Sequence, residues 1–227
     1  MSERIDDLQY KGLRILQDTE EFCFGCDAVE LANFADMKAG RLAYDLGAGT
    51  GIIAVLVAAK KGVRVRAIES NPVTAELCRR SVEMNGQTAE IETYTMRAQD
   101  CPQTFGRDAD YVLANPPYFK TGTGRMHDNP SVACARHELT LSLAELTETA
   151  AALLQTGGAF YTVYPAERLA EVLTACSARR LEPKILQTLT PGADKSPHLF
   201  LLKCVYGGRP GLKILPERPV RAFGVQE

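Results

Sequence analysis

Short apolar runs alternate with longer amphipathic segments along most of this 227-residue chain. Runs of five or six mostly apolar residues predict strands, and longer segments with apolar positions at helical spacing predict helices. The expected order is strand 41–46, helix 51–60, strand 63–68, helix 72–84, strand 90–95, strand 109–114, helix 141–154, strand 159–164, helix 166–179 and strands 184–189 and 198–206. Strands that alternate with helices form a mostly parallel sheet covered on both faces. We therefore expect an α/β fold with a seven-stranded sheet that closes with a C-terminal antiparallel hairpin.

The first 36 residues do not follow this alternation. The polar segment 17–21 predicts a turn, and Asp27 is suited to cap an amphipathic helix over residues 28–35. We expect residues 1–36 to be a cap segment that packs over a ligand site. Residues 37–227 then form one main domain, because a chain of this length supports a single core.

A glycine-rich turn stands where the first strand of the alternating series meets the helix after it. Gly47, Gly49 and Gly51 follow this strand, and glycines here permit positive φ and close approach of a ligand to an electropositive helix N-terminus. The G-x-G-x-G spacing differs from the dinucleotide-binding G-x-G-x-x-G, since Ile52 replaces the third glycine. Asp45 would repel a pyrophosphate and attract a cationic amino acid group. The turn therefore favours S-adenosylmethionine over a nicotinamide cofactor.

Two further carboxylates follow later strands. Glu69 ends strand 63–68, and Asp100 comes shortly after strand 90–95. Ligands of open α/β sheets bind beyond the carboxyl ends of the strands. Glu69 is suited to accept both hydroxyls of a ribose, and Asp100 to accept from an adenine amino group. A single acid of this kind is more often a solvated loop residue. The occurrence of such acids after three successive strands, at Asp45, Glu69 and Asp100, is what indicates a nucleoside site.

The segment Asn115-Pro-Pro-Tyr118 follows the apolar strand 109–114. Each proline fixes its own φ and restricts the residue before it, so the acceptors of Asn115 and Pro116 are held in few conformations. The Asn115 side-chain oxygen and the Pro116 carbonyl can each accept from an exocyclic NH₂, while Tyr118 offers a face for stacking a planar ring. The alternative is an ordinary loop after a strand, since Pro-Pro often punctuates loops.

Together these motifs resemble the class I S-adenosylmethionine-dependent amino-methyltransferases. The motifs concerned are Asp45-Leu-Gly-Ala-Gly-Thr-Gly51, Glu69, Asp100 and Asn115-Pro-Pro-Tyr118. Three flanking segments, Leu13–Gln17, Phe22–Ala32 and Ala135–Glu138, are more narrowly similar to bacterial methyltransferases that modify adenine N6 beside the anticodon of a valine tRNA. The resemblance extends over nearly the whole chain.

The resemblance implies a Rossmann-like class I methyltransferase fold with S-adenosylmethionine as cofactor. Its implied catalytic residues are Asn115, Pro116, Pro117 and Tyr118. Its implied cofactor-binding residues are Phe24, Gly25, Asp27, Asp45, Gly47, Gly49, Gly51, Glu69, Ser70, Asp100, Cys101 and Asn115. The implied partner is a tRNA anticodon loop, whose bases leave the stack at less cost than paired ones. For the protein itself we expect a cytoplasmic location; the sequence leaves the oligomeric state open, and a monomer is favoured.

Charge and loop length suggest where RNA would bind. Residues 183–227 contain seven basic and three acidic side chains, a net charge of +4 in a chain whose net charge is −2. Phosphate neutralisation dominates nucleic-acid affinity, so this basic tail is a candidate RNA contact, although a solvated basic face accounts for it equally well. The long segment 119–136 after the tetrad is typical of a functional lid. The candidate substrate-binding residues are Tyr118, Arg136, Lys213, Arg218 and Arg221; an ion pair with Glu138 is the alternative for Arg136.

The cysteines and the apolar runs argue against a disulfide-stabilised protein, a zinc protein, a secreted protein and a membrane-spanning protein. Seven scattered cysteines indicate a reducing compartment, and the Cys23-x-x-Cys26 pair has no second pair or nearby histidine to complete a zinc site. We therefore expect no metal. The acidic, polar N-terminus does not resemble a signal peptide, and the longest apolar run, residues 52–59, is too short to span a bilayer.

Two other functions remain compatible with the motifs. The same tetrad serves enzymes that methylate a glutamine side-chain amide in a translation factor, because that NH₂ is also planar and weakly nucleophilic. Only 44 residues precede Asp45 here, whereas those enzymes carry a larger helical N-terminal domain. A non-catalytic module that binds S-adenosylmethionine or RNA is the other alternative, and an intact tetrad and glycine turn argue against it.

Overall fold

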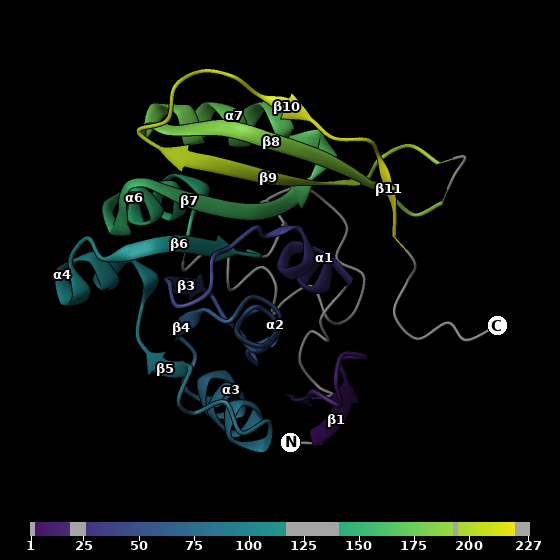
Figure 1. Cartoon of the computed structure of the whole chain (residues 1–227), viewed down its shortest axis with the longest axis vertical. Helices are drawn as coiled ribbons and strands as arrows, with labels where there is room; N and C mark the ends of the chain where they lie inside the picture. Colours follow the sequence, from purple (N-terminus) through teal and green to yellow (C-terminus); the bar gives the residue numbers. More distant parts are fainter. Residues whose placement is uncertain (1–2, 19–25, 117–140, 193–194, 221–227) are drawn as a thin grey trace, which may run out of the picture.

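The computed structural model describes residues 3–18, 26–116, 141–192 and 195–220, and within them it contains a nine-stranded central sheet and a separate two-stranded hairpin (Figure 1). The strands are β1 (Glu3–Asp7), β2 (Arg14–Asp18), β3 (Leu42–Leu46), β4 (Arg64–Glu69), β5 (Ile91–Thr95), β6 (Ala109–Ala114), β7 (Leu154–Pro165), β8 (Leu181–Thr190), β9 (Leu199–Tyr206), β10 (Lys213–Ile214) and β11 (Arg218–Pro219). The helices are α1 (Cys26–Phe34), α2 (Ile52–Lys61), α3 (Pro72–Met84), α4 (Cys101–Phe105), α6 (Leu143–Leu153) and α7 (Leu169–Ala178), with short 3-10 turns η1 (Ala98–Asp100) and η2 (Ala166–Arg168).

The central sheet runs in the order β10-β8-β9-β7-β6-β3-β4-β5, and β11 also pairs with β8. Neighbouring strands from β5 to β7 are parallel, whereas β9 is antiparallel to both β7 and β8. The seven strands expected from the sequence are therefore present, with the antiparallel pair at the C-terminal end. Two short strands, β10 and β11, extend the sheet beyond this expectation.

Side chains of each central strand alternate between two cores. On β3, Ala43 faces a core shared with α1, α2 and α3, whereas Tyr44 and Leu46 face a core shared with α4, α6 and α7. Parallel strands covered on both faces must be apolar on both sides, which explains why they appear in the sequence as near-continuous apolar runs. The helices of the described residues thus divide between the two faces of the sheet (Figure 1).

The N-terminal segment differs from the sequence expectation. Gln17 and Asp18 belong to β2 rather than to a turn, and α1 begins at Cys26, so Asp27 lies inside its first turn. The β1–β2 hairpin lies against α3, where Ser81 Oγ accepts from Leu16 N at 3.0 Å and Asn85 Oδ1 accepts from Arg14 N at 2.9 Å. Residues 17 and 18 therefore belong to a strand although their polar side chains locally favour a turn, because contacts with distant residues hold this strand in place.

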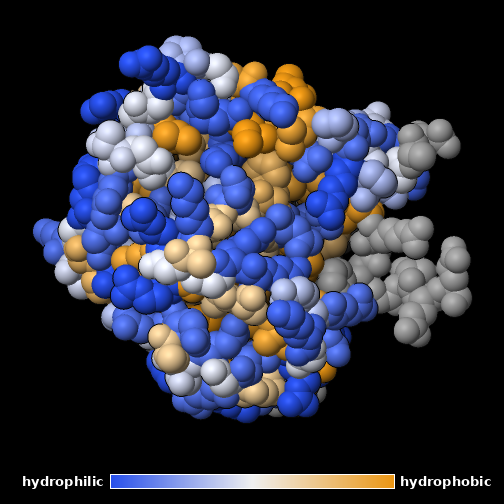
Figure 2. All heavy atoms as spheres, viewed as in Figure 1, coloured by the Kyte–Doolittle hydropathy of each residue, from blue (hydrophilic) through white to orange (hydrophobic). Residues whose placement is uncertain are grey.

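The C-terminal segment follows the edge strand β8 and returns toward α1. Lys213 and Ile214 pair with the middle of β8, and β11 pairs with its last two residues. Leu212 and Ile214 expose 42% and 68% of their surface, and hydrophobic atoms gather at the β10 end of the sheet in Figure 2. Val220 is buried in the same core as α1, so the tail packs onto the body of the domain.

Candidate functional site

The carboxyl ends of β3, β4 and β6 lie side by side and carry the motifs predicted from the sequence. Asp45 of β3 pairs in register with Ala67 of β4 and with Leu113 of β6. The residues that follow these strands, the glycine turn after β3, Ser70 after β4 and Asn115 after β6, therefore emerge at one edge of the sheet. Parallel topology thus brings together segments that are up to 70 residues apart in sequence.

Asp45 is fully buried beneath the glycine turn. Its Oδ2 accepts from Ala54 N at 3.1 Å, in the first turn of α2, while its Oδ1 has no hydrogen-bond partner among the described residues. Burial raises the pKa of Asp45 to about 7, with a smaller contribution from the nearby Glu69 carboxylate, and the bond from Ala54 N acts in the opposite direction. A buried carboxylate oxygen without a partner is costly, so this atom is suited to accept from a cationic ligand.

The glycine turn has the geometry for a ligand to approach its backbone. Gly47 and Gly49 have φ of 73° and 56°, and a Cβ added at either would meet no described atom within 4 Å. Gly47 N and Ala48 N both donate to Ile68 O at 2.9 Å, which fixes the turn over the end of β4. The turn is therefore positioned by the sheet while its glycines border open space.

Glu69 links this turn to the end of β4. It is buried, its Oε2 accepts from Gly49 N at 3.0 Å, and its Oε1 accepts from Asn71 N at 2.8 Å. A carboxylate has about four lone-pair positions, so these two bonds leave acceptor capacity for hydroxyl groups. Glu69 thus supports the backbone of the turn as well as offering the acceptors that the sequence analysis assigned to it.

The other candidate cofactor residues lie around this edge in different environments. Ser70 is exposed and its Oγ lies 3.5 Å from Glu69 Oε1. Asp100 is exposed at the end of η1, and Cys101 is buried at the start of α4, where burial raises the pKa of its thiol to about 12 and keeps it neutral. Asp27 is buried in the first turn of α1, and its Oδ1 accepts from Ala28 N at 3.0 Å.

Asn115 and Pro116 follow β6 directly. Asn115 is half-buried and Pro116 is buried, so the strand delivers an amide and a carbonyl that lie partly within the protein. The carbonyl of Ala114, the last residue of β6, accepts from Thr162 Oγ1 of β7 at 2.9 Å. The point at which the motif leaves the sheet is therefore fixed from the neighbouring strand.

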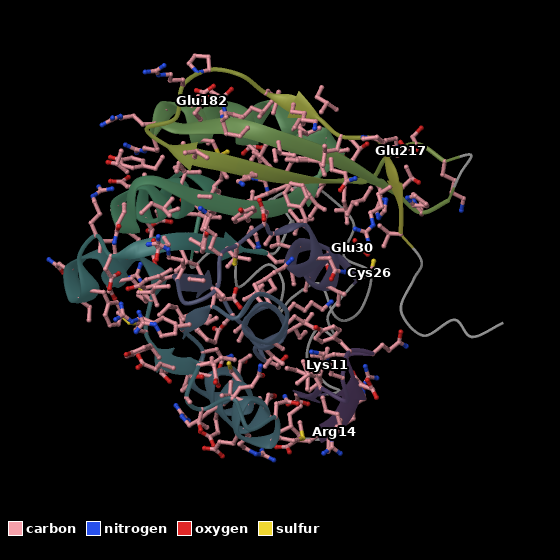
Figure 3. The ribbon with its side chains drawn as sticks, in the orientation of Figure 1. Lys11, Arg14, Cys26, Glu30, Glu182 and Glu217 are labelled. Atoms are coloured by element: carbon pink, nitrogen blue, oxygen red, sulfur yellow. The ribbon has the colours of Figure 1, made fainter. Side chains whose placement is uncertain are left out.

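The described basic residues of the tail do not share one environment. Lys213 is exposed on β10, whereas Arg218 Nη1 lies 3.2 Å from Glu30 Oε2 of α1. Figure 3 labels Glu30 on α1 and Glu217 next to β11. One of the candidate RNA contacts therefore forms an ion pair within the chain, which sequence analysis did not anticipate.

Two residues at the site were missed by sequence analysis. Cys78 of α3 is buried under the turn, and a Cβ added to Gly51, whose φ is 95°, would lie 2.7 Å from its Sγ. Thr162 is the other, and its signal in the sequence is a threonine within the otherwise apolar or aromatic run 159–164. The spacing of Cys78 gave no comparable signal.

Several candidate residues lie outside the described residues. They are Phe24, Gly25, Pro117, Tyr118, Arg136 and Arg221, and their assignments stay predictions. Among the residues that the structure does describe, no group of three His, Cys, Asp or Glu side chains is placed to hold a metal ion. Within the same ranges no helix is long and apolar enough to cross a membrane.

Known proteins share both the sequence pattern and the fold. Residues 28–175 match the family model of the methyltransferase small domain. A tRNA1(Val) (adenine(37)-N6)-methyltransferase of Shewanella amazonensis is 33% identical over 150 residues, which cover 63% of this chain and 64% of that protein. A relative with the same name from Flavobacteriaceae bacterium strain 3519-10 is 32% identical over 166 residues, which cover 69% of this chain and 65% of the relative. The chain thus spans just under two thirds of the length of these two relatives.

A solved structure supports the assignment of the fold. The crystal structure described as a predicted O-methyltransferase of Agrobacterium tumefaciens has a TM-score of 0.65 and 25% identity, with 86% of each chain covered. The strand order and this likeness confirm the class I methyltransferase fold expected from the sequence. Since the family model covers more than half of the chain, the protein belongs to the methyltransferase small domain family.

Proposed function

We propose that this protein transfers a methyl group from S-adenosylmethionine to the exocyclic N6 of an adenine in RNA, the adenine beside the anticodon of a valine tRNA. The observation that carries the proposal is the placement of Asn115 and Pro116 at the same sheet edge as Asp45 and the glycine turn. The tRNA adenine-N6 methyltransferases to which this chain is similar support the adenine and the tRNA. An RNA substrate also implies a cytoplasmic setting.

The residues in and around the glycine turn fit S-adenosylmethionine. The unpartnered Oδ1 of Asp45 is suited to its ammonium group, the remaining lone pairs of Glu69 are suited to the ribose hydroxyls, and the open space at Gly47 and Gly49 admits a ligand against the backbone. When bound, S-adenosylmethionine supplies an electrophilic methyl group on a sulfonium. All of these residues come from one chain, so a monomer suffices.

Phe24, Gly25, Asp27, Ser70, Asp100 and Cys101 complete the proposed cofactor site. We assign residues 1–36 as a cap over it, because α1 packs against α2, the helix that begins at the glycine turn. The β1–β2 hairpin of the same N-terminal segment packs on α3. The main domain is then formed by residues 37–227.

Asn115 and Pro116 orient the amino group of the target base. Adenine N6 is a poor nucleophile because its lone pair is delocalised into the ring. Hydrogen bonds from its two N–H groups to the Asn115 side-chain oxygen and the Pro116 carbonyl favour pyramidalisation and direct the lone pair toward the methyl group, so that orientation lowers most of the barrier. The methylated nitrogen then loses its proton to water, and no side chain is required as a base. We assign Pro117 to rigidify the motif and Tyr118 to stack on the base.

The test is to incubate the protein with labelled S-adenosylmethionine and total RNA that lacks this modification, and then to locate the label by nucleoside mass spectrometry. N6-methyladenosine in one tRNA is the expected result. Absence of label from the RNA nucleosides would refute the proposed activity. A parallel reaction with total cell protein in place of RNA tests glutamine methylation, and label there but not in RNA would support that alternative.

Three variants at Asn115 and Tyr118 test these roles. Asn115→Ala should reduce the single-turnover rate about 10²- to 10³-fold and leave cofactor affinity nearly intact, since Asn115 is only one of the implied cofactor contacts; this is the scale for one lost preorganised partner of a transition state. Tyr118→Phe should keep the stacking face and stay near the parent rate, whereas Tyr118→Ala should weaken capture of the base. A parent-like rate for Asn115→Ala would mean that the amide only ends a strand.

A further inference from the structure

Thr162 is a buried hydroxyl group in an apolar strand. The described residues 159–164 of β7 are all buried, and Thr162 itself is 0% exposed between aromatic and aliphatic neighbours. A buried hydroxyl without a hydrogen bond is costly, and valine would fill the same volume in a strand without that cost. The presence of threonine here therefore depends on the bond that its hydroxyl makes.

That bond holds the last carbonyl of β6. Thr162 is in register with Ala114, and its Oγ1 donates to Ala114 O at 2.9 Å. On its other side Thr162 pairs with Leu202 of β9, so β7 is fixed in the sheet from both edges. The hydroxyl group thus connects the Ala114 carbonyl to a strand that is hydrogen-bonded on both sides.

The Ala114 carbonyl belongs to the peptide plane that enters Asn115. The orientation of this plane sets the backbone of Asn115 on one side, while Pro116 restricts Asn115 from the other side. Together the two constraints leave the Asn115 side chain few directions in which to point. An error of about 1 Å in a positioned group can lower a rate about 100-fold.

We propose that Thr162 is a positioning residue for methyl transfer, acting through the Ala114 carbonyl to aim the Asn115 amide at the target amino group. The inference rests on the proposed function, in which Asn115 contacts that amino group. Thr162 acts on the substrate side of the site, because Asp45, Glu69 and the glycine turn belong to β3, β4 and the loops after them. Loss of its hydroxyl should therefore slow the reaction without weakening cofactor binding.

The experiment compares Thr162→Val, which removes the hydroxyl but retains the shape, with Thr162→Ser, which retains the hydroxyl. Thr147→Val is the matched control, since Thr147 is also buried and its hydroxyl donates to Leu143 O at 3.0 Å within α6. Each variant is assayed for single-turnover methylation of an unmodified tRNA(Val) transcript with saturating S-adenosylmethionine, for cofactor affinity by calorimetry and for stability in urea. The urea measurement shows whether each variant is folded before its rate is interpreted.

Thr162→Val should lower the single-turnover rate about 10- to 100-fold with an unchanged cofactor Kd, and Thr162→Ser should stay within about threefold of the parent. Thr147→Val should lose comparable stability and keep the parent rate. A parent-like rate for Thr162→Val, or an equal loss of rate in Thr147→Val, overturns the inference. If Thr162→Val does not fold, Thr162→Cys replaces it: its weak donor should give an intermediate rate, and a parent-like rate refutes the inference.

Asn115→Ala, measured in parallel, separates the two levels of the argument. Loss of activity in Asn115→Ala with none in Thr162→Val refutes only the role of Thr162. A parent-like rate for Asn115→Ala refutes the proposed role of Asn115, and the inference about Thr162 with it.

Discussion

Cofactor binding should depend on pH through Asp45. The carboxyl group is fully buried, one of its oxygens has no described partner, and burial raises its pKa to about 7. The described titratable group that acts on it is Glu69 of β4, whose charge favours the neutral form of Asp45. A cationic ammonium group at the free oxygen has the opposite effect, because it stabilises the carboxylate.

The sign of the effect follows from these two states. The pKa of Asp45 is high in the ligand-free protein and falls when the ammonium group binds, so binding releases a proton. Affinity for S-adenosylmethionine should therefore rise with pH up to about 7 and level off above it. At pH 5 about 1% of the ligand-free protein has the carboxylate that binds, so the observed Kd should be about 100-fold weaker than the plateau value.

Isothermal titration calorimetry from pH 5 to 7.5 measures this change directly. Staying at or below pH 7.5 keeps most of the ligand's α-amino groups, whose pKa is about 7.7–8.0, in the charged form. Repeating each titration in two buffers with different ionisation enthalpies counts the released protons. Asp45→Asn is the matched control: it should weaken binding at pH 7.5 about 10- to 100-fold and abolish the dependence on pH, because the amide cannot titrate. A flat profile for the parent protein, or the parent profile in Asp45→Asn, would refute this reasoning.

Three further changes test the remaining parts of the site. Glu69→Gln replaces one acceptor by a donor, so it should weaken S-adenosylmethionine binding about 10-fold or more by calorimetry, and a parent Kd would show that the carboxylate is dispensable. Gly51→Ala should lower the free energy of unfolding by about 1–3 kcal/mol in urea, since φ is 95° and the new Cβ would lie 2.7 Å from Cys78 Sγ; adding Cys78→Ala should restore only the steric part. Neutralising Lys213, Arg218 and Arg221 together should flatten the salt dependence of tRNA binding by about 0.7–0.9 log unit per lost phosphate contact. Glu30→Gln, which breaks the ion pair of Arg218 within the chain, is the control for a purely structural effect. If the triple variant binds tRNA with the salt dependence of the parent protein, these three residues form only a solvated basic face.

The apolar pattern and the glycine turn are sufficient to predict the framework of the fold and the sheet edge that carries the candidate site. Strands 41–46 and 109–114 were recognisable because a parallel strand covered on both faces must be apolar throughout. The positive φ of Gly47, Gly49 and Gly51 followed from the turn between a strand and a helix, which few other residues can adopt. Because parallel strands end at one edge, the motifs after β3, β4 and β6 could be predicted to lie together.

Elements and contacts that depend on partners far away in the sequence could be identified only from the folded chain. Strand β2 contains polar and charged residues that locally favour a turn, and it forms because β1 and α3 provide its hydrogen bonds. The strands β10 and β11 are too short to give a pattern and exist because the edge of β8 offers free backbone groups. Short-range preference therefore does not identify them.

The chemical state of the site was likewise outside the reach of sequence. Whether an oxygen of Asp45 is paired, and hence the pKa of its carboxyl group, depends on what lies within a few ångströms in three dimensions. The Arg218–Glu30 ion pair joins residues that are 188 positions apart, and Thr162 reaches Ala114 only through the register of β6 and β7. Residue type and spacing specify which groups are available, whereas folding decides which of them meet, because pairing depends on distances that the order of residues does not encode.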